Sequence, residues 1–189
     1  MDLSPDKRER ILAAASKLIV QNGLQCSMSA IADEAGVATG SLYNYFKSKE
    51  DLVSGVYGRV AAAMSEQVAD DLDPSLPHDV RIQRYIRAYI DFIWADATRA
   101  LLFEYLDNNP LISIKEAGRI FGAFVDHSTV MLDAARRDGV VKDASPVLMA
   151  SFMRGAIRNT LKRRRHGPAE LSDMEREQIA AMCWDAVVA

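Results

Sequence analysis

The stretch that decides the fold is Ser27–Leu52, which reads SMSAIADEAGVATGSLYNYFKSKEDL. Ser27 can cap a short helix, because its hydroxyl can accept a hydrogen bond from the free amides of the first turn. Gly36 follows this helix where the chain must turn through a left-handed conformation. A second short helix then places Leu42 and Phe46 on its inner side. Two short helices joined by a tight turn form a helix-turn-helix, which inserts its second helix in the major groove of DNA.

The same stretch resembles a known family. The matching motifs are Ile31-Ala32, Ala35-Gly36-Val37, Gly40-Ser41-Leu42-Tyr43, Tyr45-Phe46 and Ser48-Lys49-Glu50-Asp51-Leu52. Together they resemble the N-terminal signature of TetR-family (TetR/AcrR-like) transcriptional regulators. The resemblance is specific over residues 7–55 and architectural over residues 56–189. It implies a homodimer that binds a palindromic operator, acts as a repressor and is released by a small-molecule effector. Thr39 departs from the basic or larger polar residue that the family often carries there, which affects base preference but not the fold.

Apolar residues recur at helical spacing along the rest of the chain, and no segment alternates as a strand would. The sequence therefore predicts an all-α, nine-helix TetR-like fold. A three-helix helix-turn-helix domain is expected over residues 1–48, and a helical bundle for ligand binding and dimerisation over residues 49–189. No flexible linker follows Phe46, so a rigid helix would join the two domains. The predicted helices span residues 5–22, 28–35, 39–46, 49–71, 78–96, 98–107, 114–138, 146–165 and 172–189.

Composition and charge limit the possible functions. The 189 residues are 49% hydrophobic and 26% charged, a balance typical of globular proteins. No run of eighteen apolar residues occurs and the N-terminus does not read as a signal peptide, so no membrane association and a cytoplasmic location are predicted. The net charge of −3 is unfavourable for nucleic acid, and residues 1–52 carry six basic against seven acidic side chains. DNA binding must therefore depend on where the cations lie, and a dimer would double the contacts.

The polar side chains of the helix-turn-helix are the predicted contacts with double-stranded DNA. Phosphates can be bound by hydroxyl groups as well as by lysine, whereas base edges are read in the groove. Thr39, Gly40 and Asn44 are best placed for bases. Ser27, Ser41, Tyr43, Tyr45 and Lys49 are best placed for phosphates, and Ser29 is a further contact.

The region after residue 56 is rich in aromatic and methionine side chains. These form either a packed core or the lining of a ligand cavity between helices, as helical bundles often have. The family resemblance favours the cavity, occupied by an apolar or aromatic effector whose polar end is fixed by His127 or Asn159. Effector binding would change operator affinity through the helix over residues 48–71. The predicted ligand-binding residues are Tyr89, Phe92, Phe103, Phe124, His127, Met131, Phe152 and Asn159.

The last two predicted helices, over residues 146–165 and 172–189, look like an association surface. Gly155 and Ala156 would let another helix approach closely. Apolar residues near the chain end form a strip that a monomer would expose, and the resemblance implies that these two helices pair with their mates in a homodimer. The run from Lys162 to Arg165 is interpreted as solvated cations at a helix C-terminus, in preference to a second DNA site. The strip consists of Ile179, Met182, Cys183, Ala186 and Val187.

Two other functional classes fit the sequence less well. An enzyme is disfavoured, because the chain lacks a glycine-rich phosphate loop, an HExxH motif and a Gly-x-Ser-x-Gly motif. A helical small-molecule carrier would fit residues 56–189 but leaves the helix-turn-helix unexplained. No cofactor and no metal are predicted, since His78, His127 and His166 lack metal-ligand spacing. Cys26 and Cys183 are predicted to be reduced thiols. A redox-sensing Cys26 is the alternative, because a helix N-terminus lowers thiol pKa.

Overall fold

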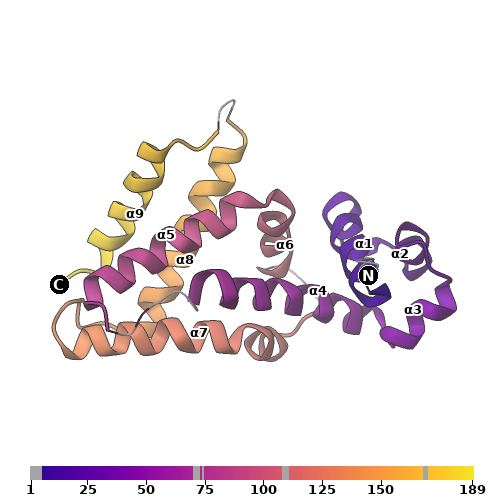
Figure 1. Cartoon of the computed structure of the whole chain (residues 1–189), viewed down its shortest axis with the longest axis horizontal. Coiled ribbons are helices and arrows are strands. Elements are labelled where there is room, and N and C mark those ends of the chain that lie inside the picture. The colour runs from indigo at the N-terminus through magenta and orange to yellow at the C-terminus, as the bar shows by residue number, and fades with distance from the viewer. Residues whose placement is uncertain (1–5, 70–72, 74, 108–110, 168–169) are drawn as a thin grey trace, which may run out of the picture. The chain divides into compact units, whose positions relative to one another are not determined.

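The computed structural model describes residues 6–69, 73, 75–107, 111–167 and 170–189, and over these ranges the chain is almost entirely helical (Figure 1). The described residues contain nine α-helices and no strand, and an isolated bridge joins Val141 to Val188. The predicted all-α fold is therefore confirmed. The helices are α1 (Lys7–Asn22), α2 (Met28–Glu34), α3 (Thr39–Tyr45), α4 (Lys49–Met64), α5 (His78–Ala95), α6 (Ala97–Asp107), α7 (Ile114–Arg137), α8 (Pro146–Arg165) and α9 (Asp173–Val187).

One predicted helix is shorter than expected. The pattern predicts a single helix over residues 49–71, but α4 ends at Met64 and a π-helical turn, η2 (Ser65–Ala69), follows it. Residues 70–72 lie outside the described ranges. The other predicted boundaries lie within two residues of the observed ones, and a 3₁₀ turn, η1 (Gly23–Gln25), follows α1. No helix in the described ranges is both long and apolar enough to cross a membrane.

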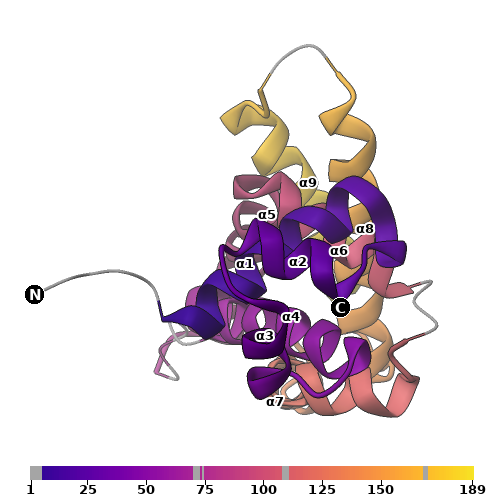
Figure 2. The same ribbon diagram turned by 90° about the vertical axis from the view of Figure 1, so that its right-hand side faces the viewer.

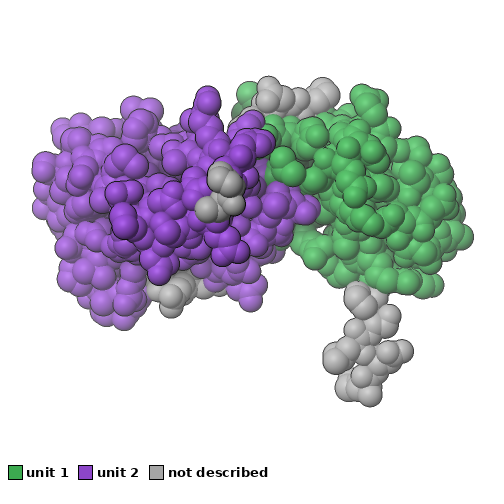
Figure 3. All heavy atoms as spheres, turned by 90° about the horizontal axis from the view of Figure 1, so that it is seen from above, with its two compact units in different colours: residues 1–61, 101–121 green, residues 62–100, 122–189 purple. Residues whose placement is uncertain are grey.

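The chain divides into two compact units (Figure 3). Unit 1 comprises residues 1–61 and 101–121, and unit 2 comprises residues 62–100 and 122–189. The division falls inside α4, α6 and α7, so each of these helices contributes to both units. The predicted boundary between residues 48 and 49 separates a DNA-binding domain from a domain for ligand binding and dimerisation, and this functional division remains a prediction.

In unit 1, α2 packs against both α1 and α3 (Figure 2). Ser27 caps α2, and its hydroxyl accepts a hydrogen bond from Ala30 N at 3.1 Å. Gly36 ends α2 at φ 64°, where Val37 N donates to Ala32 O at 3.0 Å and Gly36 N to Asp33 O at 3.1 Å. This pair of bonds is a Schellman motif, which needs a left-handed residue. The turn between the helices is therefore fixed by local chemistry, as the sequence predicts.

The inner side of α3 is held by two residues that the sequence singled out. Leu42 is 0% exposed and Phe46 is 2% exposed. The ring of Phe46 lies against α4, because a Cβ added at Gly55 would lie 2.9 Å from Phe46 Cε1 and 3.1 Å from Leu12 Cδ2. Gly55 thus allows α4, α1 and Phe46 to approach one another. This close packing fixes the orientation of α3 within unit 1.

In unit 2, α5 packs against α8, α9 and η2. The inward side of α5 is apolar and aromatic, and its buried residues include Ile82, Tyr85, Ile86, Tyr89, Ile90 and Ile93. On the outer side, the Arg87 guanidinium donates to the Glu177 carboxylate at 2.8 to 3.1 Å, which joins α5 to α9.

Both ends of α9 are held by hydrogen bonds. At its start, Ser172 and Glu175 form a capping box. At its end, Lys142 Nζ donates to Ala186 O at 2.7 Å, and Lys142 N donates to Val187 O at 2.8 Å. These contacts fix α9 on the body of unit 2.

Candidate functional site

The outer face of α3 is the first candidate site, because it presents polar side chains to solvent on a rigid support. Tyr43 is 44% exposed, Tyr45 is 39% exposed, and Asn44 and Gly40 are also exposed. A Cβ at Gly40 would meet no atom within 4 Å, so this face of the helix is open. Thr39, the first residue of α3, is half-buried, as is Ser41. Six of the predicted contact residues therefore lie on this one short helix: Thr39, Gly40, Ser41, Tyr43, Asn44 and Tyr45.

The predicted contacts outside α3 also lie in unit 1. Ser27 and Ser29 are exposed at the start of α2, with their hydroxyl oxygens 2.9 Å apart. Because Ser27 also caps α2, its hydroxyl serves the fold before it serves any ligand. Lys49 is half-buried at the start of α4 and lowers the pKa of Cys26 by its charge, against the larger opposite effect of burial. Whether these residues contact DNA remains a prediction.

The cationic side chains near α3 differ in the contacts that they make within the protein. Lys47 is exposed, and its Nζ donates to Tyr43 O at 3.2 Å, which keeps the ammonium beside α3. Arg8 lies 5.4 Å from the Phe46 ring centroid and 3.5 Å from the Glu9 carboxylate. The positive charge that a phosphate would meet is therefore concentrated at Lys47 and Lys49, which follow α3 directly.

The first turn of α4 begins with a variant of the capping box. Ser48 Oγ accepts from Asp51 N at 3.2 Å, but the Asp51 carboxylate accepts from Lys47 N at 2.9 Å and not from Ser48 N. The Asp51 carboxylate therefore gives a partner to the backbone amide of Lys47, whereas in a capping box it would accept from the amide of Ser48.

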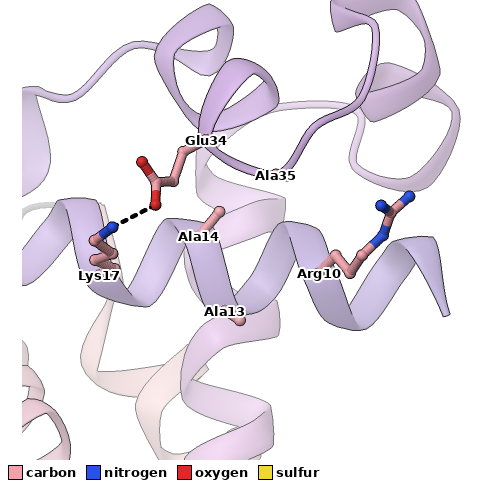
Figure 4. A pocket seen from close by; sticks show the side chains of 6 residues that line it. All are labelled: Arg10, Ala13, Ala14, Lys17, Glu34 and Ala35. Atoms are coloured by element: carbon pink, nitrogen blue, oxygen red, sulfur yellow. Dashed lines mark hydrogen bonds and ion pairs between the residues drawn. The ribbon is translucent and has the colours of Figure 1, made fainter. Parts of the chain in front are cut away.

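An open groove of about 300 Å³ lies between α1 and α2 (Figure 4). Arg10, Ala13, Ala14, Lys17, Glu34 and Ala35 line it. Lys17 Nζ is 2.5 Å from the Glu34 carboxylate, so this cation is already paired. The rest of the lining consists of three alanine methyl groups and the guanidinium of Arg10.

Unit 2 contains the second candidate site, an aromatic cluster between α5 and α7. The ring centroids of Tyr85, Tyr89 and Phe124 lie 5.9 to 6.3 Å apart in stacked arrangements. All three side chains are at most 3% exposed. Tyr89 and Phe124 are predicted ligand residues, and Phe92 and Met131, two others, are also buried in this unit. These four side chains belong to the interior of unit 2, and whether they contact a ligand remains a prediction.

His127, like His78, has a buried ring nitrogen without a hydrogen-bond partner among the described residues. It is half-buried on α7, and its Nε2 atom is buried without a hydrogen-bond partner among the described residues. A buried polar atom normally has a partner, and its absence is costly. His127 is therefore a residue that a ligand could satisfy.

Three predicted ligand residues lie elsewhere. Phe152 is 56% exposed and Asn159 is exposed, both on the outer face of α8. Phe103 belongs to unit 1, where its ring packs 5.8 Å from that of Phe121. The structure does not bring these three side chains to the aromatic cluster, because helical spacing shows which residues share a face but not which face points inward.

Arg154 forms a polar group beside the aromatic cluster that no sequence motif predicts. Arg154 Nη1 donates to Ser128 Oγ at 2.9 Å and to the Tyr85 hydroxyl at 3.2 Å. Ser128 is 0% exposed, and no other polar or charged residue in the described ranges is classed as buried. Burial raises the pKa of Tyr85, so its hydroxyl remains neutral at physiological pH. The signal in the sequence was an arginine next to Met153, within the otherwise apolar first half of α8.

The exposed apolar surface of α8 and α9 differs from the predicted strip. Ile179, Cys183 and Val187 are at most 7% exposed, so most of the strip is covered within the chain, and this expectation was wrong. The reason is that this face of α9 packs on α5. The large apolar side chains that α8 and α9 do expose are Val147, Leu148, Phe152, Met174 and Met182, at 55 to 71%.

The basic end of α8 is also organised differently from the prediction. Arg164 donates to the Glu175 carboxylate at 2.7 and 3.1 Å. Arg165 donates to Ile93 O and Trp94 O at 2.6 Å and lies over the Trp94 ring. Two of the four cations are thus used within the fold, to close the C-terminus of α5 and to hold α9.

The two cysteines are not poised for reaction. Cys26 is 8% exposed and Cys183 is 4% exposed, and burial raises the pKa of both thiols. Because the thiolate is the reactive form, this environment disfavours the redox-sensing alternative for Cys26. Among the described residues, no three His, Cys, Asp or Glu side chains are grouped as metal ligands would be.

Comparisons with known proteins agree with the geometry. Residues 11–56 match the model of the bacterial regulatory proteins of the tetR family. The uncharacterized HTH-type transcriptional regulator YhgD of Bacillus subtilis (strain 168) is 24% identical over 153 residues, which cover 80% of this chain and 80% of the relative.

Solved structures agree over nearly the whole chain. A putative TetR-family transcriptional regulator from Vibrio parahaemolyticus is similar with a TM-score of 0.76 and 26% identity, over 97% of this chain and 100% of that one. The structure of AibR in complex with isovaleryl coenzyme A and operator DNA is similar with a TM-score of 0.75 and 19% identity, over 96% of this chain and 97% of that one. Because the sequence identity to AibR is only 19%, this similarity shows a shared fold and no more.

Proposed function

The chain belongs to the TetR family of bacterial transcriptional regulators, and from this premise we propose that it is a ligand-responsive repressor that binds a palindromic operator as a homodimer. The observation that carries the proposal is the outer face of α3, which presents Asn44 and Tyr43 to solvent while Leu42 and Phe46 hold the helix from behind. An exposed polar helix on a rigid support is what major-groove binding requires.

Base and phosphate contacts are assigned by position. Thr39, Gly40 and Asn44 would contact base edges, because they lie at the start and on the exposed side of α3. Tyr43, Tyr45 and Lys49 would contact phosphates, with Ser27, Ser29 and Ser41. Since residues 1–52 carry no net positive charge, one such unit would bind weakly. A dimer doubles the contacts with DNA, and once its first half-site is bound, binding to the second half-site is intramolecular.

The dimer is proposed to form through α8 and α9. Val147, Leu148 and Phe152 on α8 and Met174 and Met182 on α9 are all more than half exposed in the single chain. Large exposed apolar side chains on two helices that contact each other are typical of an association surface. Two-fold symmetry of the protein would then match a palindromic operator.

The effector is proposed to bind among α5, α7 and α8 of unit 2. Tyr89, Phe92, Phe124 and Met131 would contact its apolar part, and the unpartnered Nε2 of His127 would contact a polar group. AibR shows that a protein of similar fold binds both an organic ligand and operator DNA. The ligand can act only by preferring one arrangement of the operator-binding parts, and α4 contributes to both units and is the proposed connection.

The operator-binding proposal is tested by measuring the affinity for operator DNA at several salt concentrations. Lys49→Ala should weaken binding to all sequences alike and lower the salt slope by about one unit, because one phosphate contact is lost. Asn44→Ala should reduce discrimination among bases and leave the salt slope unchanged. Lys115→Ala is the matched control, since it removes the same charge from an exposed position on α7.

The outcomes are distinct. If Lys49→Ala changes which bases are preferred, the assignment to phosphates is wrong. If the protein binds every duplex with equal affinity, operator-specific regulation is wrong, and a carrier function for unit 2 would be the better conclusion.

A further inference from the structure

Arg154 on α8 lies beside the aromatic cluster of unit 2 and has no acidic partner among the described residues. Its Nη1 atom donates to two neutral groups, Ser128 Oγ at 2.9 Å and the Tyr85 hydroxyl at 3.2 Å. Its guanidinium carbon lies 5.7 Å from the centroid of the Phe124 ring. Within the described ranges, no carboxylate forms an ion pair with Arg154. A half-buried charge of this kind gains from an anion more than an exposed one does.

The polar neighbours of Arg154 orient it but do not neutralise it. Ser128 Oγ donates its proton to Val125 O at 2.9 Å, so its lone pairs are directed to Arg154. Tyr85 stays protonated because burial raises its pKa. The guanidinium is therefore held in one place with its full positive charge.

The edge of Arg154 that remains is the one that binds carboxylates in this same protein. Arg87 contacts Glu177 through Nε at 2.9 Å and Nη2 at 2.8 Å. Arg164 contacts Glu175 through Nε at 2.7 Å and Nη2 at 3.1 Å. In Arg154 both hydrogen bonds come from Nη1, and the described residues give neither Nε nor Nη2 a hydrogen-bond partner.

We propose that the Nε–Nη2 edge of Arg154 binds the carboxylate of a small organic acid, and that this acid is the effector. A carboxylate presents two oxygens in one plane and matches the two parallel N–H groups of this edge. The buried rings of Tyr85 and Phe124 next to the guanidinium favour an acid with an apolar or aromatic body. This inference rests on the proposed function and gives its effector a chemical class. Ser128 is assigned as the positioning residue.

The experiment measures binding of phenylacetate and hexanoate to the full-length protein by calorimetry. Phenylacetamide and hexanamide are the matched uncharged probes. The acids should bind at least about tenfold more tightly than the amides, because they alone form charge-assisted hydrogen bonds. The Nε–H signal of Arg154 in ¹⁵N NMR spectra should move on addition of either acid.

The variants separate binding from folding. Arg154→Met should lose acid binding by about tenfold or more, and Arg154→Lys should recover only part of it, since a lysine keeps the charge but not the two-pronged edge. Ser128→Ala should weaken acid binding and leave amide binding unchanged. Arg87→Met, which removes an exposed arginine from α5, is the control and should bind as the wild type does. Thermal melts confirm that each variant is folded.

Three results would overturn the proposal. The first is that neither acid moves the Arg154 Nε–H signal. The second is that Arg154→Met binds the acids as tightly as the wild type does. The third is that inorganic phosphate binds at Arg154 as tightly as the acids do. The third result would identify a general oxyanion site in place of a carboxylate site.

Operator affinity measured in the same samples distinguishes this inference from the proposed function. If an acid binds at Arg154 and lowers operator affinity about 5- to 150-fold, both stand. If it binds there without changing operator affinity, the carboxylate site stands and the effector assignment is wrong. If an uncharged compound releases the operator while no acid binds, the regulatory function stands and the assignment of Arg154 is wrong.

Discussion

Gly55 shows how one missing side chain sets the orientation of the DNA-binding helix. A Cβ at this position would lie 2.9 Å from Phe46 and 3.1 Å from Leu12, closer than ordinary packing allows. Both neighbours are core residues, at 2% and 0% exposure, so neither can move away freely. Because Phe46 directly follows α3, the space left by Gly55 affects how α3 is held.

Gly55→Ala is therefore expected to destabilise unit 1. Overpacking of a tight core costs about 1–3 kcal/mol. Gly58→Ala is the matched control on the same helix, because its Cβ would meet nothing within 4 Å. That change should be neutral or stabilise by up to about 1 kcal/mol through helix propensity. Chemical denaturation of both variants measures the difference, and equal stabilities would contradict the packing argument.

At the scale of an element, α9 depends on the chemistry of its first turn. Ser172 Oγ accepts from Glu175 N at 3.3 Å, and the Glu175 carboxylate accepts from Ser172 N at 2.9 Å. Arg164 of α8 donates to the same carboxylate, so one glutamate caps α9 and joins it to α8. These bonds lower the pKa of Glu175 to about 2, chiefly through Arg164.

The low pKa of Glu175 predicts a pH dependence. A carboxyl group whose folded pKa lies below its unfolded value of 4.5 stabilises the fold above about pH 4.5, and this contribution disappears as the pH falls towards about 2. Glu175→Gln should thus be less stable than the wild type at pH 7, and the difference should shrink between about pH 4.5 and 2. Thermal melts across this range measure it. A stability gap that is constant down to pH 2 would show that the charge of Glu175 is not responsible.

At the scale of the whole molecule, function is proposed to need two chains. Phe152 and Leu148 on α8 are 56% and 64% exposed, although α8 is otherwise a core helix of unit 2. Neither residue contributes to the aromatic cluster. Their exposure is accounted for if a second copy of the chain covers them.

Leu148→Glu is predicted to convert the dimer to a monomer and to weaken operator binding by about 10² or more, because the second half-site is no longer bound intramolecularly. Val130→Glu is the control, since Val130 is 69% exposed on α7, outside the proposed interface. Sedimentation measures the oligomeric state, and anisotropy with labelled operator measures affinity. A monomeric wild type, or a dimeric Leu148→Glu variant, would contradict the proposed interface.

The sequence by itself determined the features that depend on neighbours along the chain. The cap at Ser27, the turn at Gly36, and the burial of Leu42 and Phe46 follow from hydrogen bonds and periodicity within a few residues. For the same reason the helix-turn-helix and most helix ends could be predicted.

Only the tertiary structure decided which face of each helix meets which neighbour. Phe152 and Met153 are adjacent on α8, yet one is 56% exposed and the other 0% exposed. The apolar side of α9 is covered by α5, and Arg154 meets Ser128 and Tyr85 from 26 and 69 residues away. Helical spacing fixes the relative directions of side chains on one helix, but the rotation of that helix is set by packing between segments far apart in the chain.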